Sequence, residues 1–205
     1  MARRTKDEAE QTRDALLDAA EKMFYARGVS RTSLEQIAAG AGVTRGAVYW
    51  HFRDKLALCT AMADRVFLPH EDMLRELAAQ PSNTPLKDLK KACIHSLRMM
   101  ATDKRRRTVV SILTLRCEYV EEMVGIMERR TECKDRMLEA SEKLLARARK
   151  LNMLAPCWTP RKAALALQAL MLGLITNGLS RGDAYDFAAV GVPCVEAFFK
   201  SLQAD

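Results

Sequence analysis

The stretch TSLEQIAAGAGVTRGAVYWHFRDK, residues 32–55, decides how this chain folds. Thr32 followed three residues later by Glu35 has the spacing of a capping box, which predicts a helix that starts at Ser33. Apolar residues then recur on one face of that helix. Gly42 is placed to end the helix, because glycine adopts the left-handed conformation that other residues avoid.

A second short helix follows the turn. Thr44 is placed to cap it, and Val48 and Phe52 fall on the face that points toward the core. An arginine in the first turn and exposed aromatic side chains suit a helix that enters the major groove of DNA. The side chains left to face outward are Arg45, Tyr49, Trp50 and His51. The two helices together predict a helix-turn-helix.

This motif resembles the signature of the TetR family of transcriptional repressors. The consensus positions that the chain fills are Gly28, Thr32, Ile37, Ala38, Ala41, Gly42, Val43, Gly46, Tyr49, Phe52 and Lys55. Residues 1–14, the string VTRGAVYWHF (43–52) and the segment RRRTVVSILTLRCEYVEEM (105–123) resemble one branch, the AcrR- and TtgR-like regulators of multidrug efflux pumps. The resemblance implies a ligand-responsive repressor that leaves a palindromic operator when an apolar small molecule binds.

Composition favours a helical protein. Hydrophobic residues make up 49% of the 205 positions, with 9 Gly and 6 Pro, which argues against disorder. No apolar segment follows the basic start, so no secretion signal is expected. The most apolar run, 163–175, is shorter than the ~20 residues of a membrane span. We therefore expect a cytoplasmic protein without a membrane partner.

The net charge of +7 is unevenly distributed. Residues 1–6 carry three basic and no acidic side chains, whereas residues 7–26 carry two basic and six acidic ones. Residues 27–55 carry five basic and two acidic side chains. The N-terminal arm and the helix-turn-helix should therefore attract phosphate, and the acidic first helix should face away from it.

Other chemistry finds little support in the residues. The six cysteines, at 59, 93, 117, 133, 157 and 194, lack metal-ligand spacing, so no metal and no cofactor is expected. No constellation typical of an enzyme is present. A thiol-based redox-sensing repressor of the same fold stays an alternative. An interaction module that no longer binds DNA is disfavoured by the intact Arg45, Tyr49 and Lys55.

Helix signals predict an all-α fold of about nine helices, three of them in a DNA-binding head of residues 1–58. Residues 59–205 would form a C-terminal ligand-binding and dimerisation bundle. Cap, proline and glycine signals place the helices at 5–27, 33–41, 44–52, from 55 with Pro69 as a kink or end, from 85, 103–120, 122–151, 160–180 and 186–202. The resemblance implies that the last two helices pair with a second copy in a homodimer.

Roles on the DNA follow from side-chain chemistry. Arg45 is the candidate for reading a guanine, and Ala47 for touching a thymine methyl. Gly46 would allow close approach, Trp50 could pack inside the head or lie along the DNA backbone, and Arg3, Arg4 and Lys6 could reach a minor groove or add nonspecific attraction. The candidates for phosphate contacts are Thr32, Ser33, Thr44, Tyr49, His51 and Lys55.

The ligand site rests on the resemblance, which implies a cavity inside the C-terminal bundle. It would be lined by Cys93, Ser96, Val110, Thr114, Met137, Ser141, Gln168, Met171, Leu172 and Ile175. Small polar or soft side chains on apolar faces suit an apolar pocket with a few orienting groups. Each of these residues could instead be ordinary core. Val110 and Thr114 stand where relatives carry amide or imidazole groups, so drug specificity does not transfer.

Overall fold

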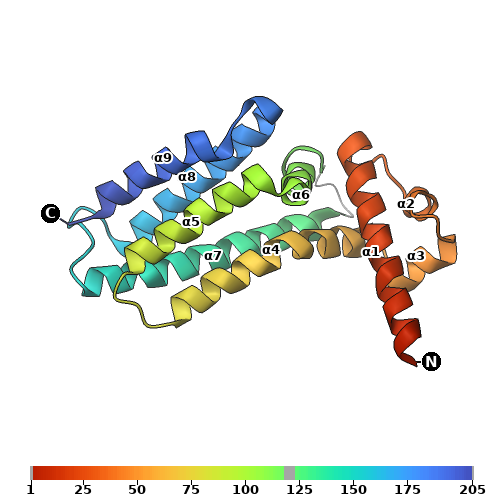
Figure 1. Cartoon of the computed structure of the whole chain (residues 1–205), viewed down its shortest axis with the longest axis horizontal. Helices are drawn as coiled ribbons and strands as arrows, with labels where there is room; N and C mark the ends of the chain where they lie inside the picture. Colours follow the sequence, from red (N-terminus) through yellow and green to blue (C-terminus); the bar gives the residue numbers. More distant parts are fainter. Residues whose placement is uncertain (1, 118–122, 205) are drawn as a thin grey trace. The chain divides into compact units, whose positions relative to one another are not determined.

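The computed structural model of this chain describes residues 2–117 and 123–204, and in them the fold is all-α, as predicted. Nine α-helices are present in these two ranges (Figure 1). A short 3-10 turn, Gly182–Ala184, separates the last two. The helices are α1 Ala2–Arg27, α2 Leu34–Gly40, α3 Arg45–His51, α4 Lys55–Ala79, α5 Pro85–Thr102, α6 Lys104–Leu115, α7 Val124–Lys150, α8 Pro160–Arg181 and α9 Phe187–Leu202.

Several predicted helix limits need correction. Helix α1 begins at Ala2, three residues before the predicted start at residue 5. Helix α4 continues through Pro69 to Ala79, so this proline does not end it. The helix predicted over 103–120 ends at Leu115, since Arg116 and Cys117 are not helical, and the helix predicted from residue 122 begins at Val124; residues 118–122 themselves lie outside the described residues. The predicted helix start at residue 85 is confirmed, since α5 starts with Pro85.

The chain forms two compact units whose limits differ from a single cut in the sequence. The first unit contains the residues up to 66 together with 108–130, and the second contains 67–107 together with residues from 131 onward. Helices α4, α6 and α7 therefore each contribute to both units. The predicted domain boundary after residue 58 stays a prediction.

The core of the first unit is formed by the apolar face of α1. Leu16, Leu17 and Phe24 are fully buried, together with Val48 of α3 and Leu58 of α4. Figure 1 shows α2 and α3 packed beside α1. Burial of these side chains against one another is the main favourable contribution to this small core. The core fixes which face of α3 is left for solvent.

The end of α6 also belongs to the first unit. Its last turn leads to Arg116, whose carbonyl accepts the backbone N–H of Val29 at 3.2 Å. The Arg116 guanidinium lies 4.7 Å from the centre of the Tyr25 ring. Gly28, with φ +87°, provides the sharp turn between these contacts. A segment that is distant in the sequence thus holds the loop between α1 and α2.

The acidic stripe of α1 has a partner on α4. The guanidinium of Arg65 donates to Asp14, to Asp18 at 2.9 Å and to Glu21 at 3.4 Å. Next to it in the sequence, Asp64 pairs with Arg129 of α7 at 3.0 Å. The acidic residues of α1 were predicted to face away from phosphate, and three of them pair with the Arg65 guanidinium of α4.

The core of the second unit is built around α5 and α9, which lie side by side with α8 (Figure 1). Leu97 of α5 and Phe199 of α9 belong to one buried apolar cluster. A Cβ atom at Gly191 would lie 2.8 Å from a Leu97 methyl carbon. Glycine at this position therefore allows the close approach of α9 to α5.

Helix α8 is unusually apolar for a helix with so much exposed surface. By length and composition, its 22 residues are apolar enough to cross a membrane. The run 163–175, considered in the sequence, was too short for this. A core helix of a soluble protein can have the same composition. Only 28% of its most apolar window is buried within this chain. Leu165 and Leu172 are 45% and 44% exposed.

Candidate nucleic-acid interface

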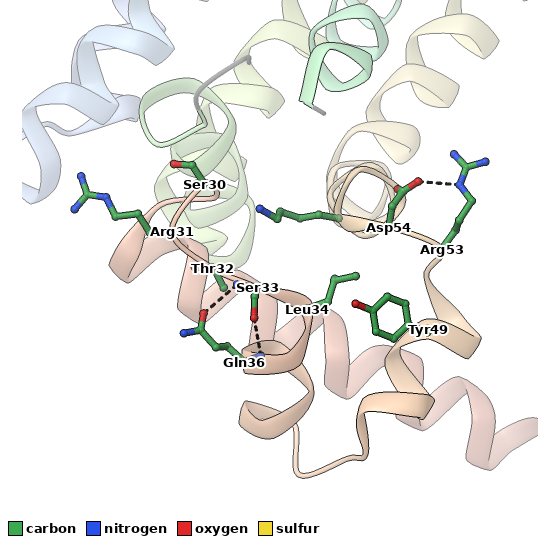
Figure 2. Close-up of a pocket in the computed structure, with 10 residues that line it drawn as sticks. Ser30, Arg31, Thr32, Ser33, Leu34, Gln36, Tyr49, Arg53 and Asp54 are labelled. Atoms are coloured by element: carbon green, nitrogen blue, oxygen red, sulfur yellow. Dashed lines mark hydrogen bonds and ion pairs between the residues drawn. The ribbon is translucent and has the colours of Figure 1, made fainter. Parts of the chain in front are cut away.

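The first helix of the motif begins one residue later than predicted. The N-cap of α2 is Ser33, whose hydroxyl accepts the backbone N–H of Gln36 at 3.2 Å. The Gln36 side chain accepts the backbone N–H of Ser33 at 3.0 Å, as Figure 2 shows. The predicted box between Thr32 and Glu35 is therefore wrong by one residue, because the adjacent pair has an equally good N3 side chain in glutamine.

Thr32 lies inside the head. It is 1% exposed, and its hydroxyl donates to the carbonyl of Gly28 at 2.9 Å. This bond helps to close the loop that leads into α2. The phosphate contact predicted for Thr32 stays a prediction, and it would require the hydroxyl to leave the Gly28 carbonyl, because a phosphate oxygen needs a donor.

The turn and the second cap agree with the sequence. Gly42 has φ +70°, as predicted, and the backbone N–H of Val43 donates to the carbonyl of Ala38 at 3.0 Å. The hydroxyl of Thr44 accepts the backbone N–H of Ala47 at 3.2 Å and caps α3. These local bonds fix the direction of α3 relative to α2.

The outward face of α3 carries large side chains. The Arg45 side chain is 73% exposed, and Tyr49 and Trp50 are 44% and 74% exposed. Val48 and Phe52 are buried, as predicted. Of the two possibilities for Trp50, packing inside the head is therefore wrong. Its ring instead meets the ring of His51 edge-on, with centroids 4.5 Å apart.

Gly46 and Ala47, which lie between these large side chains, have little or no side chain to project from the surface. A Cβ atom at Gly46 would meet the Thr44 hydroxyl at 3.9 Å and nothing closer. Packing within the head therefore does not require a glycine there. Ala47 beside it is half-buried. Both observations support the predicted close approach of this surface to DNA.

The sequence did not single out Glu35 as part of this surface. Its carboxylate accepts the Tyr49 hydroxyl at 2.9 Å and pairs with the Arg45 guanidinium at 3.2 Å. Its own backbone N–H, Tyr49 and Ser33 lower the pKa of Glu35 by hydrogen bonding, and Arg45 lowers it further. Glu35 is therefore ionised at neutral pH. The sequence placed Glu35 in the first turn of α2, but only the structure shows that this turn lies beside α3.

His51 differs from the other candidates in charge. Partial burial lowers the pKa of His51 below its usual 6.5, and the nearby positive charge of Arg13 lowers it further. The imidazole is therefore neutral at pH 7. A phosphate contact from His51 would be a neutral N–H donor and would release no counterion.

Figure 2 shows a groove on this side of the first unit, at the start of α4. The Asp54 carboxylate accepts the backbone N–H of Ala57 at 2.7 Å, which caps α4 as predicted and lowers the pKa of Asp54. Arg53 pairs with Asp54 at 2.8 Å. The groove is lined by Ser30, Arg31, Thr32, Ser33, Leu34, Gln36, Tyr49, Arg53, Asp54 and Lys55.

The groove contains predicted and additional residues. Ser33, Tyr49 and Lys55 were predicted phosphate contacts, and they line one concave surface. Arg31 and Arg53 were not singled out, although both contribute to the basic balance of residues 27–55. A positively charged concave surface at a helix N-terminus suits a phosphate group.

The N-terminal arm is helical. Helix α1 already includes Arg3 and Arg4, whose side chains lie outside the described part of the structure. The Lys6 side chain is exposed. The predicted reach of these residues into a minor groove stays a prediction.

The predicted ligand-binding residues fall in both units. Val110 and Thr114 belong to the first unit, and the other eight belong to the second. Within the second, Cys93 and Ser96 are buried on α5, and the Gln168 amide donates to the carbonyl of Lys134 at 2.8 Å. Leu172 is exposed, and Met137, Met171 and Ile175 pack against the buried apolar cluster, while Ser141 is partly buried. Their role as a cavity lining stays a prediction.

Comparison with known families matches both parts of the chain. Residues 16–62 match the family described as bacterial regulatory proteins, tetR family. Residues 84–204 match the family described as MAATS-type transcriptional repressor, C-terminal region. The first match covers the helix-turn-helix and its neighbouring helices, and the second covers α5 to α9.

Individual relatives match over nearly the whole chain. The HTH-type transcriptional repressor BepR of Brucella suis biovar 1 (strain 1330) is 37% identical over 98% of this chain and 97% of its own length. NalD, the secondary repressor of the MexAB-OprM multidrug efflux pump in Pseudomonas aeruginosa, has a TM-score of 0.87 at 39% identity, covering 97% of this chain and 99% of NalD. The SmeT–triclosan complex, whose protein is the repressor of the Stenotrophomonas maltophilia multidrug efflux pump SmeDEF, has a TM-score of 0.87 at 34% identity, covering 95% and 93%.

Proposed function

The chain belongs to the TetR family of bacterial transcriptional repressors, and from this premise we propose that it represses a multidrug efflux pump operon. The observation that carries the proposal is the capped recognition helix α3, which presents Arg45, Tyr49 and Trp50 to solvent on one side. NalD and SmeT, both similar over more than nine-tenths of the chain, are repressors of such pumps. The operator is double-stranded DNA, so the repressor works in the cytoplasm.

Within this function, Arg45 reads a guanine in the major groove through two hydrogen bonds, and Ala47 contacts a thymine methyl. Ser33, Thr44, Tyr49, Lys55 and a neutral His51 hold phosphate groups and set the register. The exposed Trp50 ring lies along the DNA backbone. The groove at the start of α4 supports the phosphate role of Lys55, because the helix N-terminus adds to its charge.

A homodimer completes the proposal. Leu165 and Leu172 of α8 and Val190 of α9 are large aliphatic side chains left in solvent by a single chain. A second copy would cover them, and two-fold symmetry would give each half of a palindromic operator one recognition helix. Two such helices must lie about 34 Å apart to enter successive major grooves.

An apolar small molecule would release the operator by binding to the second unit. Triclosan, the ligand in the SmeT complex, is an apolar compound and supports this class of inducer. The ligand acts through its differential affinity for two arrangements of the dimer. Linkage requires that operator DNA weakens ligand binding by the same factor. Helix α4, like α6 and α7, contributes residues to both units and is a continuous element that could transmit the change.

The thiol-sensing alternative loses one of its candidates. Burial raises the pKa of the Cys93 thiol to about 12, so this thiol is protonated and unreactive at neutral pH. Cys157 and Cys194 are exposed, and they are the positions at which oxidants could act. No other observation favours a redox signal over an apolar ligand.

The direct test is selection of a DNA sequence followed by its release. The wild-type protein is used to select duplexes from a randomised library, and anisotropy then gives its affinity for the selected duplex with and without triclosan. We expect a palindromic consensus, dimeric binding and weaker DNA affinity in the presence of triclosan or another hydrophobic compound. Selection of no consensus sequence would contradict the proposal. Release by thiol oxidants alone would favour the redox alternative.

A further inference from the structure

A carboxylate lies within the proposed DNA-reading surface. Glu35 stands in the first turn of α2, and its side chain is 41% exposed. Its Oε1 atom accepts the Tyr49 hydroxyl at 2.9 Å and pairs with a terminal nitrogen of Arg45 at 3.2 Å. Arg45 also lies over the Tyr49 ring, 5.7 Å from its centre. One acid thus binds the proposed base-reading side chain and occupies the single donor of Tyr49, whose proposed phosphate contact would require the hydroxyl to leave Glu35.

This arrangement leaves Arg45 able to read a base. A guanidinium has five N–H donors in a fixed plane, and Glu35 is bonded at one terminal nitrogen. The remaining donors can reach the O6 and N7 atoms of a guanine while the carboxylate stays in place. The same carboxylate restricts the rotamers of Arg45 before DNA arrives, which reduces the entropy lost on binding.

The arrangement acts differently on DNA that lacks the operator sequence. Nonspecific binding consists of cation contacts with phosphates. A phosphate that approaches Arg45 also approaches the negative carboxylate of Glu35, which repels it. The carboxylate therefore weakens nonspecific binding and leaves the base contact in the operator complex largely unaffected. Selectivity is the difference between two affinities, and it can be raised by disfavouring the wrong partner.

We propose that Glu35 is a specificity-determining residue, which positions Arg45 for the operator and disfavours contacts of Arg45 and of the Tyr49 hydroxyl with the phosphates of other DNA. This inference rests on the proposed DNA-binding function. The surface around Glu35 is otherwise suited to a polyanion. The role assigned to this acidic side chain is to make the protein bind its operator in preference to other DNA.

The test compares Glu35→Gln with the wild type on two duplexes, the selected consensus and a scrambled sequence of the same length and composition. Glutamine keeps the size and one acceptor but removes the charge. We expect affinity for the scrambled duplex to tighten roughly three- to thirtyfold per dimer, as for two exposed ion pairs. The slope of log K against log salt should steepen by about 0.9 per copy as Arg45 gains a phosphate. Affinity for the consensus should change less than threefold.

Two further variants separate the causes. Glu139→Gln makes the same change of net charge at an exposed position on α7 in the second unit, and it should leave both affinities unchanged. Glu35→Asp keeps the charge and should keep the weak nonspecific binding of the wild type. The proposal is overturned if Glu35→Gln changes both affinities by one common factor, or if the scrambled duplex binds no better. A wild type that selects no consensus would instead overturn the proposed function.

Discussion

Helices α3 and α8 both leave large side chains in solvent, but the chemistry of those side chains differs. The exposed residues of α3 combine a guanidinium, a phenol and an indole, which have donors as well as apolar surface. The exposed residues of α8 include Leu165 and Leu172, which have no polar group at all. The exposed side chains of α3 can bind favourably to a hydrated polyanion. Those of α8 contribute favourable free energy only when another apolar surface excludes water from them.

The two helices also differ in how their positions are fixed. Helix α3 has seven residues, too few to be stable alone, so it depends on its cap and on Val48 in the core. Helix α8 has 22 residues with a Thr159 cap and a proline start, and it persists with much of its surface exposed. Substitutions on α8 should therefore act on dimer formation, and substitutions on α3 should act on DNA affinity.

The largest expected effect comes from a charge on the α8 surface. Leu165→Glu should leave the single chain folded, because the side chain is already exposed, but would bury an unpaired carboxylate in the proposed dimer. We expect a cost of several kcal/mol to dimer formation. Sedimentation should show a folded monomer, with operator affinity lost although α3 is unchanged. Lys162→Glu, an exposed polar position in the same helix, is the control. A dimer of Leu165→Glu at micromolar concentration would contradict the proposed interface.

The next effect concerns the stability of the second unit in acid. Burial is the largest cause that lowers the pKa of His70 to about 4; the charges of Arg106 and His95 act in the same direction and Glu71 opposes them. The unfolded chain, with a His pKa near 6.5, binds a proton that the folded chain does not. Stability should therefore be complete above pH 6.5 and fall as the pH drops to 4, by at most about 3 kcal/mol. Urea unfolding at several pH values measures this loss.

His70→Gln should remove most of that pH dependence. The matched variant His95→Gln, at an exposed position of α5, should retain most of it, because burial of His70 is a larger cause than the charge of His95. An identical pH profile for wild type and His70→Gln would show that other groups cause the acid sensitivity.

A moderate effect is expected on the recognition surface itself. Arg45→Ala should cost roughly 1–3 kcal/mol of operator affinity and relax the preference at one base pair in each half-site. Lys55→Ala should weaken binding to all sequences alike and flatten the salt dependence by about one unit per copy. Binding to a set of single-base operator variants distinguishes the two. Unchanged sequence preference in Arg45→Ala would remove its assigned role.

The smallest effect should come from Thr32. Its buried hydroxyl donates to Gly28, so Thr32→Val should lower the stability of the head by about 1 kcal/mol. If Thr32 is also a phosphate contact, operator affinity must fall as well, with a shallower salt dependence. Thermal unfolding and anisotropy on the same variant separate these roles. A stability loss without any change in DNA affinity would leave Thr32 as a structural residue.

Local features of the fold could be predicted because their causes lie within a few residues. Thr44, Asp54 and Thr159 cap helices as their side chains dictate, and Gly42 has the expected positive φ. The α2 cap was misplaced because two overlapping pairs have capping-box spacing, and local sequence does not choose between them. The choice follows from the use of Thr32 inside the head.

Features that depend on distant residues were not predicted. No local pattern links Arg65 to the acidic face of α1, or Arg116 to Val29. The side of α3 that faces solvent followed from periodicity, but the position of Glu35 beside Arg45 depends on how α2 and α3 cross. The environment of Trp50 was open for the same reason, since an aromatic side chain suits both a core and a DNA surface.

The bond from Val29 to Arg116 has a consequence during protein synthesis. When the ribosome has added residue 66, it has made every proposed DNA-contacting side chain but not the carbonyl that Val29 binds. Roughly several more seconds of translation are needed to reach Arg116. A newly made chain therefore forms this bond only after α5 and α6 have been synthesised, and a fragment that stops after α4 should lack the support for its α1–α2 loop.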